Sequence, residues 1–329
     1  MKLLFVGDVM IGRRVNEMLT REAQEFPWGN TLPLFREADW RVCNLECCLS
    51  NGGQPQPEKI FHFRSDAKNI AVLKAAGINA VSLANNHALD FGLGALQDTL
   101  RILDSASIAH AGAGTNWRKA SQPIVSDARG VKIAFISFTD NEPEWAATDH
   151  HAGIFYVPVG ESKSHEDELL ELVQTMKEKS DLAIVAAHWG GNWGWTPPQE
   201  HILLGRRLID AGADAVIGHS PHVFRGVEIC RSCPIIYSAG NFVDDYRVDR
   251  VERNDWSFIF ILETDGPRLL RLRLYPTVIH FCQAWRAPDD EARIIAKKML
   301  ELCAALGTEV SMHDGGTLEI KLLPSTVSA

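Results

Sequence analysis

The stretch Leu182-Ala183-Ile184-Val185-Ala186-Ala187 runs directly into His188-Trp189-Gly190, and Asp214-Ala215-Val216-Ile217 runs into Gly218-His219-Ser220-Pro221-His222. Both are short runs of β-branched and small apolar residues, which are typical of buried strands. Residues 198–211 between them predict a helix, because a proline opens the segment and a glycine follows its end. Strand, helix and strand in this order predict the parallel strands of an α/β sheet.

Three earlier strand candidates end in the same kind of residue. Residues 3–6 end in Gly7-Asp8, residues 41–43 run into Asn44-Leu45-Glu46, and residues 80–84 end in Asn85-Asn86-His87. Side chains at the carboxyl ends of neighbouring parallel strands meet in one crevice, where open α/β sheets bind their ligands. We therefore expect these carboxylate, amide and imidazole groups to converge on one site.

The rest of the chain continues the alternation of strands and helices. Further helices are predicted over residues 65–76, 89–105, 165–179 and 289–305, and strand-rich stretches over 124–139, 227–239 and 256–277. Residues 1–283 are interpreted as one domain, and residues 284–329 as a C-terminal appendage of helix and strand.

Composition excludes several classes of protein. A chain of 329 residues that is 46% hydrophobic is long enough to bury a large core. Its 33 Lys and Arg against 42 Asp and Glu give a net charge of −9 without a basic stripe, which argues against a nucleic-acid partner. No run approaches the roughly 20 apolar residues of a membrane span. The short first apolar run and the odd cysteine number, seven, predict a cytoplasmic protein with reduced thiols.

The residues at the strand ends form a mixed oxygen and nitrogen ligand set without cysteine: Asp8, Glu46, Asn86, His188, His219 and His222. Carboxylates together with imidazoles suit Mn²⁺, Fe²⁺ or Zn²⁺ better than Ca²⁺. We expect one such divalent ion or a pair. A pair would acidify the water between the ions to a pKa of about 7, so that it attacks phosphorus at neutral pH. Each of these residues alone is common as a cap or a core group, but five strand ends that all finish in such residues favour a metal site.

Six ordered motifs also carry a resemblance to a known family: Gly7-Asp8-Val9-Met10-Ile11-Gly12-Arg13, Asn44-Leu45-Glu46, Leu83-Ala84-Asn85-Asn86-His87-Ala88-Leu89-Asp90-Phe91-Gly92, His188-Trp189-Gly190, Gly218-His219-Ser220-Pro221-His222 and Tyr237-Ser238-Ala239-Gly240-Asn241-Phe242. They are similar to motifs of CapA-like poly-γ-glutamate capsule biosynthesis proteins, which are related to calcineurin-like metallophosphoesterases. The resemblance covers residues 1–245. It implies an α/β fold, a four-layer αββα sandwich of two mixed sheets packed face to face with helices outside.

The resemblance also implies roles for individual residues. Asp8 would be a ligand of the first metal ion, Glu46 the bridging carboxylate and Asn86 the amide ligand. His188, His219 and His222 would complete the shell, and His87 would protonate the leaving oxygen or contact the phosphate.

The chain departs from the metallophosphoesterase pattern at three points. Met10 stands where the first motif usually has a histidine, Glu46 replaces the usual aspartate, and Ser220-Pro221 lengthens the last histidine motif. A thioether does not bind a hard cation. The number of ions, and which of His219 and His222 binds, therefore stay open.

Five further residues are candidates for catalysis or substrate binding. Arg13 follows Asp8 closely, and its guanidinium matches a phosphate or carboxylate, although solvated arginines are ordinary at a helix start. Asp90 could orient the imidazole of His87, with a helix cap as the equal alternative. Asn85, Trp189 and Asn241 are candidates for substrate contact, against the alternatives of aromatic packing for the tryptophan and a structural turn for Asn241.

We predict a metal-dependent hydrolase, foremost a phosphoesterase that acts on a small anionic substrate, phosphorylated or γ-glutamyl, with a link to poly-γ-glutamate capsule biosynthesis. Amide or γ-glutamyl hydrolysis at the same centre is the second hypothesis, because activated water also attacks carbonyl carbon. A non-catalytic partner of a polymer synthase, with a degenerate centre marked by Met10, is the third.

Overall fold

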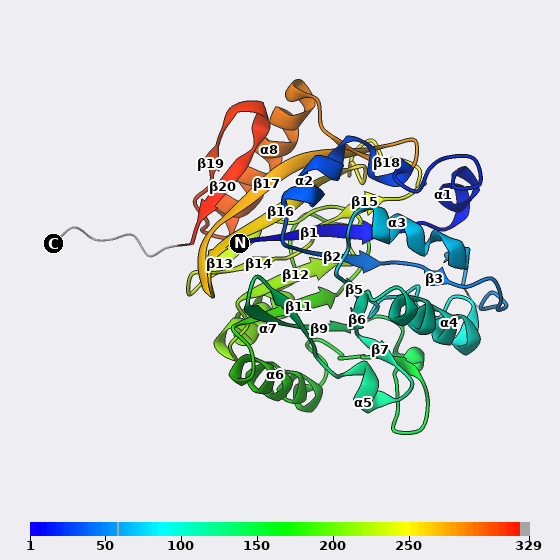
Figure 1. Cartoon of the computed structure of the whole chain (residues 1–329). Coiled ribbons are helices and arrows are strands. Elements are labelled where there is room, and N and C mark those ends of the chain that lie inside the picture. The colour runs from blue at the N-terminus through cyan, green and yellow to red at the C-terminus, as the bar shows by residue number, and fades with distance from the viewer. Residues whose placement is uncertain (58, 323–329) are drawn as a thin grey trace.

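Two β-sheets pack face to face in this protein, and helices cover the outer face of each (Figure 1). The computed structural model describes residues 1–57 and 59–322. The four-layer αββα sandwich implied by the motifs is thereby confirmed. None of the helices in these two ranges combines the length and apolar character needed to cross a bilayer.

The larger sheet is mixed. Its parallel part, β1, β2, β5 and β6, is extended on the other side of β1 by the antiparallel strands β16, β17 and β20. In spatial order its strands are β19 (Ser311–Met312), β20 (Leu318–Lys321), β17 (Arg268–His280), β16 (Trp256–Asp265), β1 (Lys2–Val9), β2 (Trp40–Leu45), β5 (Ala80–Ser82) and β6 (Ala109–Ala111), while β15 (Asn241–Val243) pairs with β1 and β18 (Gln283–Arg286) with β17.

The smaller sheet has a parallel centre with an antiparallel strand at each edge. Its order is β13 (Val227–Cys230), β14 (Cys233–Ile236), β12 (Ala215–His219), β11 (Leu182–His188), β9 (Val131–Thr139) and β8 (Ile124–Ala128). Two further pairs of short strands lie in loops, β3 (Cys48–Leu49) with β4 (Arg64–Ser65) and β7 (Ala113–Gly114) with β10 (Gly153–Ile154).

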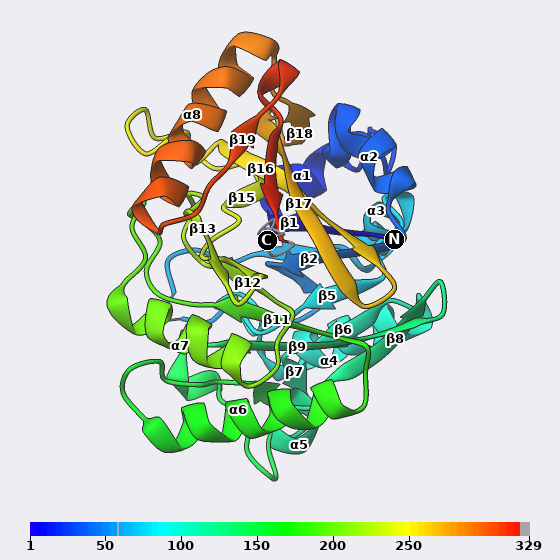
Figure 2. The same ribbon diagram turned by 90° about the vertical axis from the view of Figure 1, so that its left-hand side faces the viewer.

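All but the last of the α-helices in the described residues divide between the two outer faces. The α-helices are α1 (Arg13–Met18), α2 (Leu32–Glu37), α3 (Ile70–Ala75), α4 (Gly92–Ser105), α5 (Trp117–Ala120), α6 (Lys163–Glu178), α7 (Gln199–Asp210) and α8 (Asp289–Ala305). Helices α1 to α4 bury apolar residues against the larger sheet, and α5 to α7 against the smaller one (Figure 2). The inner layer joins Phe5 and Val42 of the larger sheet to Phe135 and Ile184 of the smaller. Each such buried side chain contributes about 1.5–3 kcal/mol.

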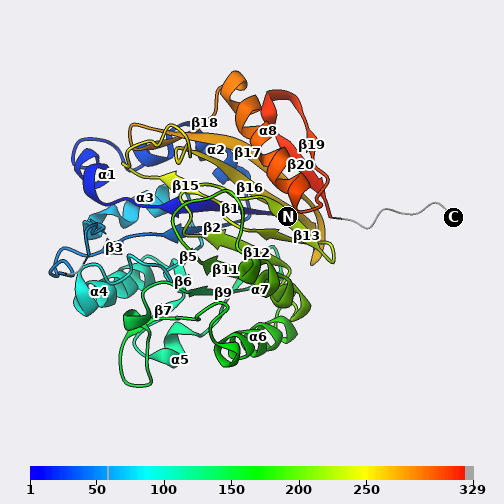
Figure 3. The ribbon, with the colours of Figure 1, turned by 180° about the vertical axis from the view of Figure 1, so that it is seen from behind.

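The C-terminal segment continues the body of the molecule. Strand β18 and strand β20 both pair with β17, and α8 packs against β17 and β13 (Figure 3). Ile295 and Met299 of α8 lie in the apolar layer between the sheets. The division of the chain at residue 284 stays a prediction, but residues 284–322 complete the core rather than lying outside it.

The strand registers place the predicted site. Asp8 on β1 pairs in register with Asn44 on β2 and with Asn241 on β15, and His188 on β11 pairs with His219 on β12. Gly7 permits the first arrangement, because a Cβ atom there would lie 1.8 Å from the carbonyl oxygen of Gly240. The strand predicted to end at residue 6 therefore continues through Gly7 and Asp8 to Val9.

Candidate metal centre and adjoining cavity

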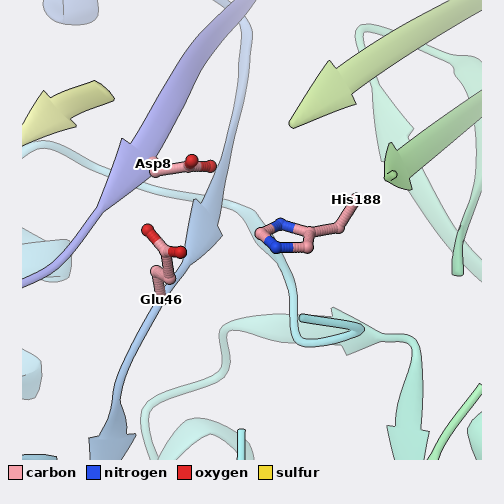
Figure 4. A group of neighbouring side chains, drawn as sticks. All are labelled: Asp8, Glu46 and His188. Atoms are coloured by element: carbon pink, nitrogen blue, oxygen red, sulfur yellow. The ribbon is translucent and has the colours of Figure 1, made fainter. Parts of the chain in front are cut away.

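Asp8, Glu46 and His188 meet at the carboxyl ends of β1, β2 and β11. One ligand atom of each lies within 4.8 Å of the other two, and all three residues are buried. Their carboxylates and imidazole face a common space between the strand ends (Figure 4). In the described part of the chain, no other three His, Cys, Asp or Glu side chains form such a group. The residues thus come from both sheets.

The chemistry of this group fits a divalent cation. Asp8 Oδ2 and Glu46 Oε2 are buried and have no hydrogen-bond partner in the described structure. Burial and the neighbouring charges of Asp8 and Asp244 raise the pKa of Glu46 well above its usual value. Burial lowers the pKa of His188 to about 3, so its imidazole is neutral and offers a lone pair. A bound dication would neutralise the two carboxylates and occupy the unpaired oxygens.

Asn44 holds two of these side chains and was not singled out as a site residue from the sequence. Its Nδ2 donates to Asp8 Oδ1 at 2.8 Å and lies 3.4 Å from His188 Nδ1. The sequence does indicate that Asn44 faces the site, because Asn44 stands two positions before Glu46 and alternate residues of a strand share a face. Such supporting hydrogen bonds orient metal ligands.

Of the other predicted ligands, His219 and Asn86 each contact a member of this group, and their binding to an ion stays a prediction. His219 Nδ1 is 3.1 Å from Asp8 Oδ1, and Asn86 Oδ1 is 3.1 Å from His188 Nε2. His222 is farther out, where its Nδ1 is 2.9 Å from Asn241 Oδ1. The geometry supports three ligands for one ion with His219 and Asn86 adjacent, and a second ion stays a prediction.

His87 and Asp90 form a buried pair beside the metal group. His87 Nδ1 lies 2.6 Å from Asp90 Oδ2, and the His87 ring stacks on Phe63 at 3.9 Å between centroids. Burial lowers the pKa of His87 to about 4 despite the opposing effect of Asp90. The neutral ring therefore donates Nδ1–H to Asp90, which leaves Nε2 as the free ring nitrogen.

Lys59 is a further residue that the sequence did not reveal. Its Nζ lies 2.9 Å from Asp90 Oδ1 and 3.2 Å from Glu142 Oε1, and it also donates to the carbonyl oxygen of Asn86. It comes from a loop more than 25 residues before Asn86, and a lone lysine in a polar loop has no distinguishing pattern. Lys59 thus connects that loop to the His87–Asp90 pair.

A cavity of about 610 Å³ opens above these residues. Its lining includes Asn86, His87 and His222 of the predicted site, and three cationic side chains, those of Arg13, Lys59 and Arg247. Aromatic and apolar side chains complete the wall, namely Ile60, Phe61, Phe63, Trp193 and Tyr246. A cavity of this size and charge suits a small anionic molecule.

Residues 2–246 match the family model described as bacterial capsule synthesis protein PGA_cap. The chain belongs to this capsule synthesis family. A probable polyglutamine synthesis accessory protein of Mycobacterium tuberculosis is 30% identical over 327 residues, which cover 95% of this chain and 86% of that protein. The PGA biosynthesis protein CapA of Bacillus subtilis is 30% identical over 244 residues, covering 73% of this chain and 62% of that protein.

A solved structure shares the fold at low sequence identity. A hypothetical protein from Thermus thermophilus superposes with a TM-score of 0.51 at 16% identity, covering 88% of this chain and all of that chain. A 5'-nucleotidase precursor from the same organism gives a TM-score of 0.48 at 13% identity, covering 95% of this chain and 60% of that chain.

In this member of the capsule synthesis family, Met10 belongs to the core. Its side chain is fully buried against the larger sheet, and its Sδ accepts a hydrogen bond of 3.2 Å from the backbone N–H of Gly12. The thioether is therefore part of the packed core, and a thioether does not bind a hard cation.

Asn85, Trp189 and Asn241, the residues predicted to contact substrate, make buried hydrogen bonds to neighbouring strands and loops, and their contact with substrate stays a prediction. All three are fully buried and none lines the cavity. Asn85 Nδ2 donates to Asn44 Oδ1 at 3.0 Å and to the carbonyl oxygen of Leu45 at 2.9 Å. Trp189 Nε1 donates to the carbonyl oxygen of Tyr237 at 3.0 Å. The physical reason for the tryptophan is strand alternation, because His188 faces the site and the next side chain faces the outer layer.

Two residues of the same family motifs, Arg13 and Asn241, line the cavity or contact a residue that lines it. Arg13 lines the cavity, and its Nε lies 3.4 Å from Asp245 Oδ2. Trp193 lines the cavity in place of Trp189 and is 49% exposed, enough for contact with a ligand. Asn241 acts through His222, whose imidazole it holds by the contact at Nδ1.

Proposed function

We propose that this member of the capsule synthesis family is a metal-dependent hydrolase that cleaves phosphoesters of a small anionic substrate. One observation carries the proposal: the buried Asp8, Glu46 and His188 present two unpaired carboxylate oxygens to a common point. Buried carboxylates without partners are costly in a fold unless a cation completes them. A divalent ion held there would activate water and stabilise charge that develops on a phosphoryl group.

The chain's own residues supply the remaining functions. Arg13 and Arg247 line the cavity with guanidinium groups, which bind phosphate oxygens in bidentate fashion. His87 keeps Nε2 free because Asp90 holds its Nδ1. Since the neutral ring carries no proton at Nε2, His87 must gain one before it can donate to a leaving oxygen, and an anionic substrate beside it favours that protonation.

Membership of the family supports a link to capsule synthesis, and the mycobacterial relative is named a probable polyglutamine synthesis accessory protein. We infer that the substrate is an anionic molecule of that process, either phosphorylated or γ-glutamyl. The cationic wall of the cavity supports either class.

The test combines metal analysis with a substrate panel. The purified chain is loaded with Mn²⁺, its metal content is measured by mass spectrometry, and rates are measured with p-nitrophenyl phosphate, bis-p-nitrophenyl phosphate and γ-glutamyl-p-nitroanilide. We expect about one ion per chain and hydrolysis of a phosphoester. Glu46→Gln and His188→Ala should lose both metal and activity, whereas His165→Ala, at an exposed histidine of α6, should retain both.

Two results would redirect the proposal. Cleavage of only the anilide would establish amide hydrolysis at the same centre. Absence of stoichiometric metal after loading would support a non-catalytic partner of a polymer synthase.

A further inference from the structure

A second cavity, of about 440 Å³, adjoins the catalytic cavity and takes no part in the proposed reaction. The two cavities share Tyr246 and Asn254 as lining residues. The second one is lined by three carboxylates, those of Asp244, Asp245 and Asp255. Apolar side chains form much of its remaining wall, namely Met18, Phe26, Val248, Ile279 and Phe281.

Two of the three carboxylates have partners. Arg253 binds both oxygens of Asp255 at 2.8 Å. Asp245 Oδ2 accepts from the backbone N–H of Arg14 at 3.1 Å and lies 3.4 Å from Arg13 Nε. Each of these two carboxylates therefore has an arginine beside it, although Asp245 Oδ1 is also buried without a hydrogen-bond partner in the described structure.

Asp244 is different. Only 4% of the residue is exposed, its Oδ1 accepts from the backbone N–H of Tyr246 at 2.9 Å, and its Oδ2 has no partner in the described structure. No Lys, Arg or His nitrogen among the described residues lies within 4 Å of its carboxylate. Arg14 also lines the cavity, but its guanidinium forms no ion pair with a described residue. Burial raises the pKa of Asp244 to about 7, and a cationic ligand beside its unpartnered oxygen would favour the charged carboxylate.

The cation that suits this cavity is an alkylammonium group. The three carboxylates do not bring their oxygens within 4.8 Å of one another, as the metal group does, so they form no cage for a bare ion in the described structure. An ammonium head has three N–H donors that can reach separate acceptors. An alkyl stem gains free energy along an apolar wall. The combination of a buried acidic end and an apolar wall matches both parts.

We propose that this cavity binds a linear alkylamine, with the ammonium on Asp244 and the stem against Ile279, Val248 and Phe281. The cavity has a different lining from the Asp8–Glu46–His188 group, although Asp244 is close enough to Glu46 to raise the pKa of that carboxyl, so the test measures metal content beside amine binding. An alkylamine site predicts selectivity for charge, because the uncharged alcohol of the same length leaves Asp244 unpaired. It also predicts that each added methylene within the cavity strengthens binding about fourfold.

The test is isothermal titration of the full, Mn²⁺-loaded chain with propylamine, butylamine, pentylamine and 1-pentanol. We expect one pentylamine per chain, affinity that rises with chain length, and binding of 1-pentanol at least tenfold weaker. Asp244→Asn should weaken pentylamine binding at least tenfold. The matched control is Asp249→Asn, at an exposed aspartate five residues away that does not line this cavity.

A second variant separates ligand binding from any loss of folding or metal. Phe281 is 74% exposed at the turn between β17 and β18, so Phe281→Ala should leave the thermal midpoint and metal content unchanged and still weaken pentylamine severalfold. Equal binding of pentylamine and 1-pentanol, or unchanged affinity in Asp244→Asn, would overturn the proposal. Loss of bound Mn²⁺ in Asp244→Asn, together with pentylamine binding that Mn²⁺ abolishes, would assign Asp244 to the metal centre and also overturn it.

Discussion

Replacement of Glu46 by glutamine should remove the metal-dependent part of the protein's thermal stability. An ion that binds only the folded chain stabilises it by about 2.7 kcal/mol when its free concentration is 100 times its Kd. An unfolding entropy of about 2.1 cal/mol/K per residue gives about 0.7 kcal/mol/K for 329 residues. Mn²⁺ at that concentration should therefore raise the melting temperature of the wild-type protein by about 4 °C.

Glu46→Gln should show less than about 1 °C of this shift, because the amide supplies no charge and leaves the ion with Asp8 and His188. Its metal-free melting temperature should equal or exceed that of the wild type, because a buried carboxylate beside Asp8 has been replaced by a neutral group. Differential scanning calorimetry with chelator and with Mn²⁺ measures both quantities. Glu171→Gln, at an exposed position of α6, is the control and should shift like the wild type. A full 4 °C shift in Glu46→Gln would refute the assignment of Glu46 as a ligand.

Three further predictions test the catalytic pair and the packing. His87→Ala should lower turnover about 10²–10⁴-fold while metal content is retained, and loss of metal equal to that in His188→Ala would contradict the role given to His87. Ser82 and Ser137 join the two sheets by a buried Oγ–Oγ contact of 2.5 Å, so Ser82→Ala should lower the free energy of unfolding in urea by about 1–3 kcal/mol. The double alanine variant should lose less stability than the sum of the losses in the two single variants, and strict additivity would argue against the hydrogen bond. Gly7→Ala should destabilise the fold by about 3 kcal/mol or more and release metal, because its Cβ would lie 1.8 Å from the carbonyl oxygen of Gly240; a stable variant with normal metal content would show that β15 can move.

The strand ends that carry Asp8, Glu46 and His188 were predictable, because regular strands place residues by simple rules. Apolar runs followed by Asp8, Glu46 and His188 identify strand ends, and parallel pairing brings strand ends to one edge. The final helix was predicted over the same residues as α8, 289–305, since its acidic first turn and long amphipathic run are local signals. The predicted helix at 65–76 is shorter in the structure, where α3 spans Ile70–Ala75.

The positions of the loop residues that line the cavity were not predictable, because these positions depend on contacts between distant loops. Lys59 reaches Asp90 across 31 positions of sequence, and no local pattern marks that pairing. The burial of Trp189 was predictable, because strand alternation after His188 turns its side chain away from the site.

The strand ends and the loops of the site are held in place by different kinds of contact. Backbone pairing between β1, β2, β11 and β12 fixes the candidate ligands, so substitutions there should act on metal affinity. The loops that line the cavity are held by single side chains, such as Arg225. Its Nε donates to the carbonyl oxygen of Gly194 at 2.9 Å, and its Nη2 donates to the carbonyl oxygen of Trp193 at 3.2 Å. Arg225 is buried and has no carboxylate partner among the described residues, so those two carbonyl groups are its principal acceptors. If the proposed function holds, changes in such a support should move Trp193 relative to the cavity and alter KM while the metal content stays constant, because loops on a rigid scaffold commonly carry recognition.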